Sequence, residues 1–392
     1  MKKLTAILML VAFGLHAEET VTRLKSDEQI VFYPSVAQRV PGETNLWRAE
    51  IRGCVFEPEK QRMLVAAFRE AMELKTEEMT PAQSVVFGER ARLFMVDHER
   101  GKKVFIRLGA NEFFVGKSGA DGRFSGEISV PDSTAATFTA ILKPGDHREF
   151  KGQIFPLEAE GVSVISDIDD TIKIIEVRDK KATLRNTFLR EFQAVPGMAE
   201  FYQSLASDPP NPPLTPPRRG TILQVRSASL PSSEGLGVGR FTGRGRSENY
   251  GDQTNHVAFH YISASPWQLY EPLAAFVAAN DFPAGPFELK QFRWKDRSFF
   301  SLFASPEKYK PGVIEPLLNG FPKRKFILIG DSGERDPEIY GALARKFPEQ
   351  IARIYIRDVT KESAESARYS KAFRDVPRVK WKLFQTPTEL RK

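Results

Sequence analysis

The sequence predicts an α/β protein in which a small, mainly β N-terminal domain precedes a doubly wound, mostly parallel sheet. Two observations support this fold class. The run 162–165 holds three β-branched apolar residues, which is typical of a strand buried in a parallel sheet. Beyond Thr171, helical segments alternate with such strands, as in parallel βαβ units. With 392 residues the chain is long enough for two domains, which we expect at 18–160 and 161–392.

The chain begins with a pattern typical of an export signal. Lys2 and Lys3 precede an apolar run of about a dozen residues, and His16 with Ala17 supplies a small-residue cleavage site. A transmembrane helix needs about twenty apolar residues, so a retained anchor is the less favoured alternative. We therefore expect 1–17 to be a signal peptide and the protein to be exported, to the periplasm of a bacterium, without a transmembrane segment after cleavage.

The N-terminal region, 18–160, has the pattern of a small antiparallel β-sandwich without catalytic residues. Turn signals such as 98–101 and 119–123 separate its short β-rich runs, and one helix is expected at 58–75. We expect this domain to orient the catalytic domain or to contact a membrane or partner. The expected strands are 46–56, 84–87, 92–97, 103–108, 112–115 and 123–130.

The stretch 162–173, VSVISDIDDTIK, places carboxylates where a buried strand opens to solvent. Asp167, Asp169 and Thr171 have the spacing D-x-D-x-T, and ligands of doubly wound sheets bind at the carboxyl ends of strands. A bound Mg²⁺ would offset the repulsion between the two acids, keep Asp167 ionised as a nucleophile, and leave Asp169 to move a proton. The alternative is an acidic turn that caps a helix.

Two further strands favour the catalytic interpretation. The run 326–336 ends in Asp331 and Asp336, which can complete the oxygen shell of a metal. The run 256–265 ends in hydroxyls, and Lys310 lies between these two runs. A hydroxyl and an ammonium are the groups that stabilise the oxygens of a phosphoryl group.

DIDDT, the strand-end Ser263, a lysine and GDSGERD follow the order of the four motifs of the haloacid-dehalogenase-like phosphatases. The chain from 161 to 358 resembles more narrowly the catalytic domain of the actin-patch-type phosphatidate phosphatases, which are kin to the lipin-type domain. The stretches that carry this resemblance are DIDDTIK, NTFLREFQAVPGM, YISASPWQLY and FILIGDSGERDPEIY. It implies a Rossmann-like sheet and a phosphatase that converts phosphatidate to diacylglycerol.

The resemblance also implies roles for individual residues. Asp167 would be the nucleophile and Asp169 the general acid and base, while Ser263 and Lys310 would contact the phosphoryl group. Mg²⁺ would be held by Asp167, the backbone carbonyl of Asp169, Asp331 and Asp336. Two choices stay open, because Ser265 could replace Ser263 and Lys308 could replace Lys310.

Two segments of the second domain need separate interpretations. The segment 173–193 corresponds by resemblance to the small flap that follows the first motif. The segment 207–254 is rich in Pro, Gly, Arg and Ser, departs from the family, and is expected to be an inserted, mostly disordered loop. The alternatives are an arginine-rich arm that recruits anionic headgroups, or a lid. Trp267 and Tyr270 have helical spacing and are expected in the core.

Composition limits the partners and cofactors. The formal net charge of +7 becomes +5 without Lys2 and Lys3, which suits an anionic substrate or a phospholipid membrane surface. No Lys/Arg run is interleaved with aromatics, so nucleic acid is not expected. Cys54 is the single cysteine and histidines number five, so carboxylates with Mg²⁺ are favoured over a zinc site. The alternatives to phosphatidate hydrolysis are an exported phosphatase for a soluble phosphate monoester and a non-catalytic phospholipid-binding module.

Overall fold

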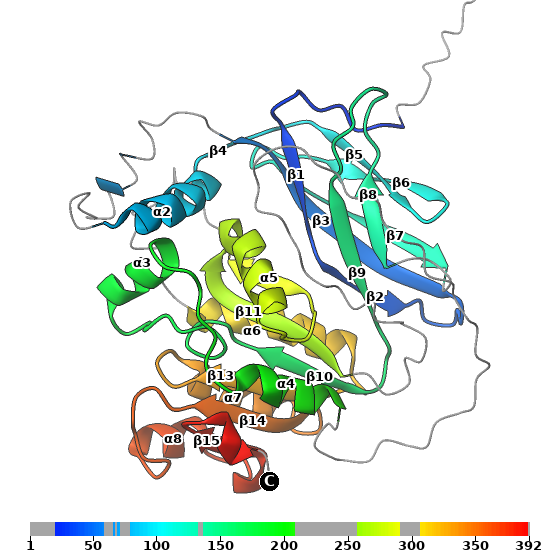
Figure 1. Ribbon diagram of the computed structural model, residues 1–392. Helices are drawn as coiled ribbons and strands as arrows, with labels where there is room; N and C mark the ends of the chain where they lie inside the picture. The colour runs from blue at the N-terminus through cyan, green and yellow to red at the C-terminus, as the bar shows by residue number, and fades with distance from the viewer. Residues whose placement is uncertain are drawn as a thin grey trace, which may run out of the picture.

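The computed structural model describes residues 20–58, 66, 69–70, 79–131, 136–207, 257–290 and 306–390. These residues form two sheets with helices around the second, as Figure 1 shows. The expected signal at 1–17, most of the expected helix at 58–75 and all but residue 207 of the expected insertion at 207–254 lie outside the described residues. Within that described part, no helix has the length and apolar character needed to cross a bilayer.

The first sheet is mainly antiparallel, as the sequence predicts. Among the described residues its strands follow the order β1-β3-β2-β9-β8-β5-β6, and β4 and β7 both pair with β3. The pair β2 with β9 is parallel, and its apolar side chains join those of the other strands in one core. The strands are β1 (Gln29–Tyr33), β2 (Ser35–Arg39), β3 (Leu46–Pro58), β4 (Val96–His98), β5 (Lys103–Leu108), β6 (Asn111–Lys117), β7 (Arg123–Pro131), β8 (Thr137–Ala140) and β9 (Lys151–Leu157).

The strand expected at 84–87 is wrong, because helix α2 (Pro81–Phe94) covers it. The strand expected at 92–97 is half wrong, because α2 covers 92–94 and only 96–97 belong to a strand, β4. Thr80 caps this helix: its hydroxyl accepts from the N–H of Gln83, and the Gln83 side chain accepts from the N–H of Thr80. The buried side chains recur at helical spacing, but one of them is charged, which hides the apolar repeat in the sequence. They are Phe87, Arg90, Ala91 and Phe94.

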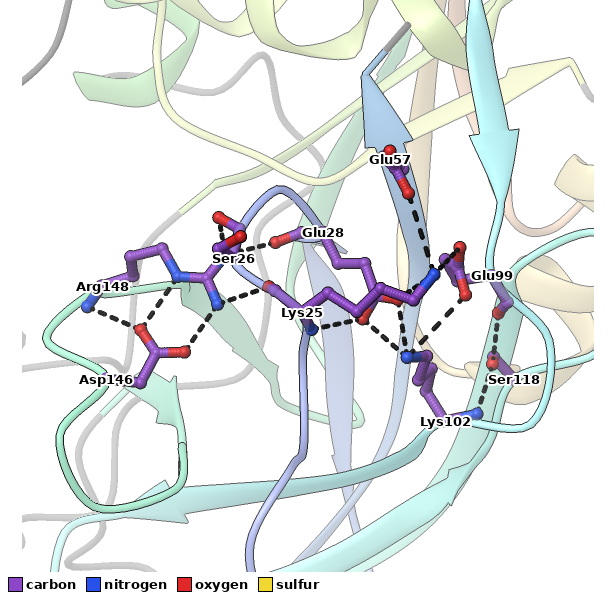
Figure 2. Close-up of polar contacts among 9 residues, drawn as sticks. All are labelled: Lys25, Ser26, Glu28, Glu57, Glu99, Lys102, Ser118, Asp146 and Arg148. Carbon is purple, nitrogen blue, oxygen red and sulfur yellow. Dashed lines mark hydrogen bonds and ion pairs between the residues drawn. The ribbon is translucent and has the colours of Figure 1, made fainter.

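A buried ion-pair network fastens the start of the described chain to the first sheet (Figure 2). The fully buried carboxylate of Glu28 accepts from the Lys102 ammonium at 2.6 and 2.7 Å and from the backbone N–H of Lys25 at 2.8 Å. Arg148 donates to the carbonyls of Lys25, Ser26 and Glu28. Because a buried charge is costly unless it is paired, these contacts stabilise the attachment of the segment before β1.

The second sheet is parallel throughout its described strands, in the order β12-β11-β10-β13-β14-β15. The chain runs from β10 outwards through β11 to β12, and later from β13 outwards to β15, so the direction reverses between β10 and β13. Ligands of open parallel sheets bind at such a reversal, outside the carboxyl ends of the strands. The strands are β10 (Val162–Ser166), β11 (Ala258–Pro266), β12 (Phe287–Lys290), β13 (Lys325–Asp331), β14 (Ile351–Arg357) and β15 (Trp381–Phe384).

Helices cover both faces of the parallel sheet. On one face Val164 and Ile327 pack with α3 (Lys180–Phe188), α4 (Met198–Ser207) and α5 (Tyr270–Ala279). On the other face Ile165 and Leu328 pack with α6 (Pro306–Gly320), α7 (Asp336–Lys346) and α8 (Ala367–Ala372). Three short 3-10 turns complete the described part: Trp267–Leu269, Arg378–Lys380 and Pro387–Leu390. The α/β class is therefore confirmed.

The two sheets are in contact through helix α2 and a polar pair. Phe87, Ala91 and Phe94 of α2 belong to the core that covers one face of the parallel sheet, and Phe94 lies 5.4 Å from Phe188 of α3 between ring centroids. Arg52 of β3 forms an ion pair with Glu288 of β12. The expected core positions are also confirmed, since Trp267 is buried and Tyr270 packs against the same core.

Candidate active site

The carboxyl ends of β10 and β13 bring the predicted acids together. Asp167 directly follows β10, and its backbone N–H donates to the carbonyl of Ile329 in β13 at 2.8 Å. Asp331 ends β13, and Asp336 is the first residue of α7. Carboxylate oxygens of these three aspartates lie within 4.8 Å of one another, and all three residues are buried.

Among the described residues, two buried oxygens of this group have no hydrogen-bond partner, Asp167 Oδ1 and Asp331 Oδ2, and only the first of them has an ion pair, with Lys310. Oδ1 of Asp331 accepts from the N–H groups of Gly333 at 2.6 Å and Glu334 at 3.2 Å. Oδ2 of Asp331 is buried and has no hydrogen-bond partner among the residues that the structure describes. A buried oxygen without a donor costs free energy, and oxygen donors of this kind suit a hard divalent cation. The group therefore fits a hard divalent cation.

Gly330 makes room for the carboxylate of Asp336. A Cβ at this position would lie 2.2 Å from Asp336 Oδ2 and 2.8 Å from its Cγ. Asp336 Oδ2 also accepts from the backbone N–H of Asp331 at 3.2 Å, so the side chain is held against the end of β13. The first glycine of the GDSGERD stretch, Gly330, is thus required because the carboxylate of Asp336 approaches its Cα closely.

Lys310 is the cation at the centre of the acidic group. Its Nζ lies 2.8 Å from Asp167 Oδ1, donates to Asp336 Oδ1, and lies 3.2 Å from Glu334 Oε2. The lysine is fully buried in α6. Sequence reasoning missed Glu334, although it stands in the same acidic motif as Asp331 and Asp336.

Within the part of the chain that the structure describes, the carboxyl groups of Asp167, Asp331, Glu334 and Asp336 lie close to the ammonium of Lys310. Burial raises the pKa of Asp167 to about 7 against the opposing effect of Lys310, and burial raises the pKa of Asp336 to about 6. Burial and the neighbouring Asp336 and Asp167 hold the pKa of Asp331 well above its usual range. Four carboxylates share one ammonium here, so a bound divalent cation would favour their ionised forms.

Asp169 lies in a second polar group beside the first. Its Oδ2 accepts from the hydroxyls of both Ser263 and Ser265, each at 2.7 Å, and its Oδ1 lies 2.7 Å from the Lys173 ammonium. Burial alone would raise the pKa of Asp169, but Lys173 and the two hydroxyls outweigh it and hold this pKa below its usual value. Contact with Asp169 does not separate Ser263 from Ser265. Ser263 differs in also accepting the N–H of Ser265, at 2.9 Å.

The turn that carries these acids is held by Asp170. This residue has a φ of 53°, a conformation that Asp tolerates better than most residues. Its carboxylate accepts from the N–H groups of Ile175, Glu176 and Val177, and its carbonyl accepts from Arg357 at 2.6 Å. The turn also lets the Thr171 hydroxyl donate to Asp167 Oδ2 at 3.0 Å.

The structure thus groups the predicted residues in two neighbouring sets. One set holds Asp167, Asp331, Asp336 and Lys310, and the other holds Asp169, Ser263 and Ser265. The side chain of Lys308 lies outside the described residues. Sequence reasoning missed Lys173 and Asp170, although both stand in the DIDDTIK stretch, because neither belongs to the D-x-D-x-T spacing.

Comparisons with known proteins match the part of the chain that contains these residues. The family model "Phosphatidate phosphatase APP1, catalytic domain" matches 162–215 and 240–358, and its interruption falls inside the expected insertion. Phosphatidate phosphatase APP1 of Saccharomyces cerevisiae is 33% identical over 201 residues, which are 50% of this chain and 26% of that protein. An uncharacterized protein of Schizosaccharomyces pombe is 26% identical over 214 residues, 54% of this chain and 27% of its own length. The chain spans about a quarter of the length of these curated relatives.

Proposed function

We propose that this chain is a Mg²⁺-dependent phosphatase. The match of residues 162–215 and 240–358 to the family model of the phosphatidate phosphatase APP1 catalytic domain supports this proposal. The substrate is a phosphate monoester, and phosphatidate, which gives diacylglycerol, is the first candidate because the yeast relative bears that name. The observation that carries the proposal is the buried group of Asp167, Asp331, Asp336 and Lys310 at the carboxyl ends of β10 and β13.

The proposed reaction uses a covalent intermediate on Asp167. A carboxylate oxygen of Asp167 attacks phosphorus, the bond from phosphorus to the ester oxygen breaks, and Asp169 gives its proton to the departing alkoxide. Water then attacks the aspartyl-phosphate, Asp169 takes a proton from that water, and inorganic phosphate leaves. The donors around Asp169 favour its ionised form, so the arrangement described here suits the second step, and Asp169 must take up a proton before the first.

Lys310 and the serines would stabilise negative charge in this reaction. The Lys310 ammonium, which already lies against Asp167, can compensate charge on the nucleophile and on the aspartyl-phosphate. The hydroxyl of Ser263 is proposed to donate to the phosphoryl group when substrate displaces its contact with Asp169. Asp167, Asp331 and Asp336, together with the backbone carbonyl of Asp169, would hold the metal. When bound, Mg²⁺ would neutralise the phosphoryl oxygens and polarise the phosphorus.

We further propose that the second sheet is the doubly wound, haloacid-dehalogenase-like sheet that the sequence predicts. The strand order, which reverses between β10 and β13, and the helices on both faces support this assignment. The domain division at 160 and 161 is proposed on the same basis, since the described strands of the first sheet end at Leu157 and those of the second begin at Val162. Export to a periplasm and contact with a phospholipid surface remain proposals from the sequence.

The test is phosphate release by the purified chain from phosphatidate vesicles and from a panel of soluble phosphate esters, with Mg²⁺ and with a chelator. We expect release that requires Mg²⁺ and is fastest with phosphatidate. Fast release from soluble esters alone would show that the substrate is a soluble phosphate monoester and not phosphatidate. Binding to vesicles without release of phosphate from any substrate would overturn the proposed phosphatase activity and would favour a non-catalytic phospholipid-binding module.

A further inference from the structure

A buried arginine of helix α2, Arg90, contacts the segment 173–193, which follows the first acidic motif. Arg90 is buried, and its Nη1 donates to the carbonyls of Thr187 and Arg190, at and just beyond the C-terminal end of α3. Figure 1 shows α2 beside α3. This residue lies outside the part of the chain that matches the phosphatase family, which begins at 162.

The ring of Phe192 is shared by two cations. The guanidinium carbon of Arg90 lies 3.9 Å from the ring centroid, and the ammonium of Lys173 lies 4.4 Å from it. Cations bind aromatic rings through the ring quadrupole, and more strongly when water is excluded. Lys173 is fully buried, so the ring of Phe192 helps to fix where its ammonium lies.

Lys173 connects the ring of Phe192 to Asp169, the acid and base of the proposed reaction. Its ammonium lies 2.7 Å from Asp169 Oδ1. The backbone on either side is paired with the segment that holds Phe192, since Ile174 donates to the carbonyl of Gln193 at 2.9 Å and Val195 donates to that of Ile172 at 2.8 Å. A displacement of Phe192 would therefore move the side chain and the backbone that support Asp169.

We propose that Arg90 is a positioning residue for Asp169, acting through Phe192 and Lys173. The inference rests on the proposed function, because it assigns the mainly β part of the chain a task in that same reaction. In this arrangement the N-terminal part sets the geometry of a proton transfer rather than only covering one face of the parallel sheet. A purely structural role would make Arg90 a docking contact whose loss lowers stability and leaves turnover unchanged.

The first test compares Arg90→Met with Arg92→Met in the full chain. Arg92 lies on the same helix and is exposed, so it is the matched control. We expect Arg90→Met to lower kcat on a soluble phosphate ester by about tenfold or more with little change in KM, because small displacements of a catalytic group cost turnover. Arg92→Met should leave both constants unchanged. A wild-type kcat in Arg90→Met would overturn the inference.

Variants of Phe192 separate positioning from packing. Phe192→Tyr keeps the ring and should retain the wild-type kcat, whereas Phe192→Leu keeps an apolar side chain without a ring and should reproduce the loss in Arg90→Met. If the two residues act as one unit, Arg90→Met with Phe192→Leu should lose no more than the worse single variant. Losses that multiply, or an equal loss in Phe192→Tyr and Phe192→Leu, would contradict the inference.

Hydrogen exchange tests the linkage without measuring activity. Arg90→Met should speed amide exchange in the peptide that covers 172–195, including the amides of Ile174 and Val195, while Arg92→Met should not. Unchanged exchange in Arg90→Met would overturn the inference even if activity fell. A wild-type chain that hydrolyses no phosphate ester would overturn the proposed function, whereas a wild-type kcat in Arg90→Met beside an active wild-type chain would overturn this inference alone.

Discussion

The ammonium of Lys310 lies 2.8 Å from Oδ1 of Asp167, and both side chains are buried. The same ammonium contacts Asp336 and Glu334, so a single lysine supports a nucleophile candidate and two other acids. Because removing one partner of a buried ion pair leaves an uncompensated charge, changes to either group affect stability as well as chemistry.

Asp167→Asn should remove at least about 99% of phosphatase turnover, because an amide cannot attack phosphorus. The side chain is nearly unchanged in size, and the Lys310 ammonium keeps its contacts with Asp336 and Glu334, so its charge stays paired in this variant. Thermal unfolding and circular dichroism should therefore remain close to those of the wild type. A variant that keeps a tenth or more of the wild-type kcat would rule out the covalent mechanism.

Asp331→Asn should raise the Mg²⁺ concentration needed for half-maximal activity, since it removes one anionic ligand from a hard-cation site. The buried Oδ2 of Asp331 has no hydrogen-bond partner in the described part of the chain, which makes it the oxygen most available to a metal. Glu349→Gln, at an exposed position, is the control and should leave the Mg²⁺ dependence unchanged. The same Mg²⁺ dependence in Asp331→Asn and the wild type would exclude Asp331 as a ligand.

Gly330→Ala should displace the carboxylate of Asp336, because the added Cβ would lie 2.2 Å from its Oδ2. Overpacking of a buried position costs about 1–3 kcal/mol, so we expect a lower melting temperature together with a loss of activity. Gly312→Ala is the matched control, since Gly312 lies in α6 two residues from Lys310 and its Cβ would meet no described atom within 4 Å apart from its chain neighbours and the nearby backbone of its own helix. That control should keep its activity. Equal behaviour of the two variants would show that the space beside Asp336 does not matter.

Ser263→Ala should reduce kcat more than Ser265→Ala. Both hydroxyls donate to Asp169 Oδ2, but only Ser263 also accepts the backbone N–H of Ser265. Its loss leaves that buried N–H without its acceptor in addition to removing the proposed donor to the phosphoryl group, while loss of the Ser265 hydroxyl leaves the strand end intact. The comparison is made by kcat on one soluble ester. A larger loss in Ser265→Ala would transfer the proposed role to Ser265.

Acid should destabilise the protein through His260. Burial lowers the pKa of His260 to about 3, while the histidine of an unfolded chain titrates near 6.5. Between these values the unfolded state binds one more proton than the folded state. The contribution of His260 to the free energy of unfolding is therefore constant above about pH 6.5 and falls by about 1.4 kcal/mol per pH unit from there down to about pH 3. Denaturant unfolding at several pH values gives the slope of the free energy of unfolding against pH. In His260→Gln this slope should be smaller by the amount that one bound proton contributes. In His147→Gln, whose side chain is exposed, the slope should equal that of the wild type.

The strands that carry the acids were predictable because their signal is local. A β-branched apolar run followed at once by carboxylates marks both β10 and β13, and their placement side by side follows from parallel packing. Among the described residues, β3, β5, β6 and β7 were also predicted close to their observed bounds, because alternating β-rich runs end at clear turn signals.

The residues that were missed depend on contacts between distant segments. Helix α2 was read as strands because Arg90 interrupts its apolar stripe, and this arginine is buried only where α3 offers carbonyl groups to it. Glu334 belongs to the site because it contacts Lys310, and Lys173 because it contacts Asp169. Spacing in the sequence does not reveal these two contacts. The choice between Ser263 and Ser265 could not be made from the sequence, and both turn out to reach the same oxygen.

The position of β10 at the centre of the parallel sheet has a consequence for biosynthesis. Ser163 pairs with Ala258 and with Phe326, so the last neighbour of β10 leaves the ribosome only after more than 160 further residues. At about 5–20 residues per second this delay is roughly ten to thirty seconds. The described strands of the first sheet all lie between Gln29 and Leu157, so this sheet can form before β13 leaves the ribosome. The apolar side chains of β10 and the buried stripe of α2 must therefore be kept from aggregation throughout that interval.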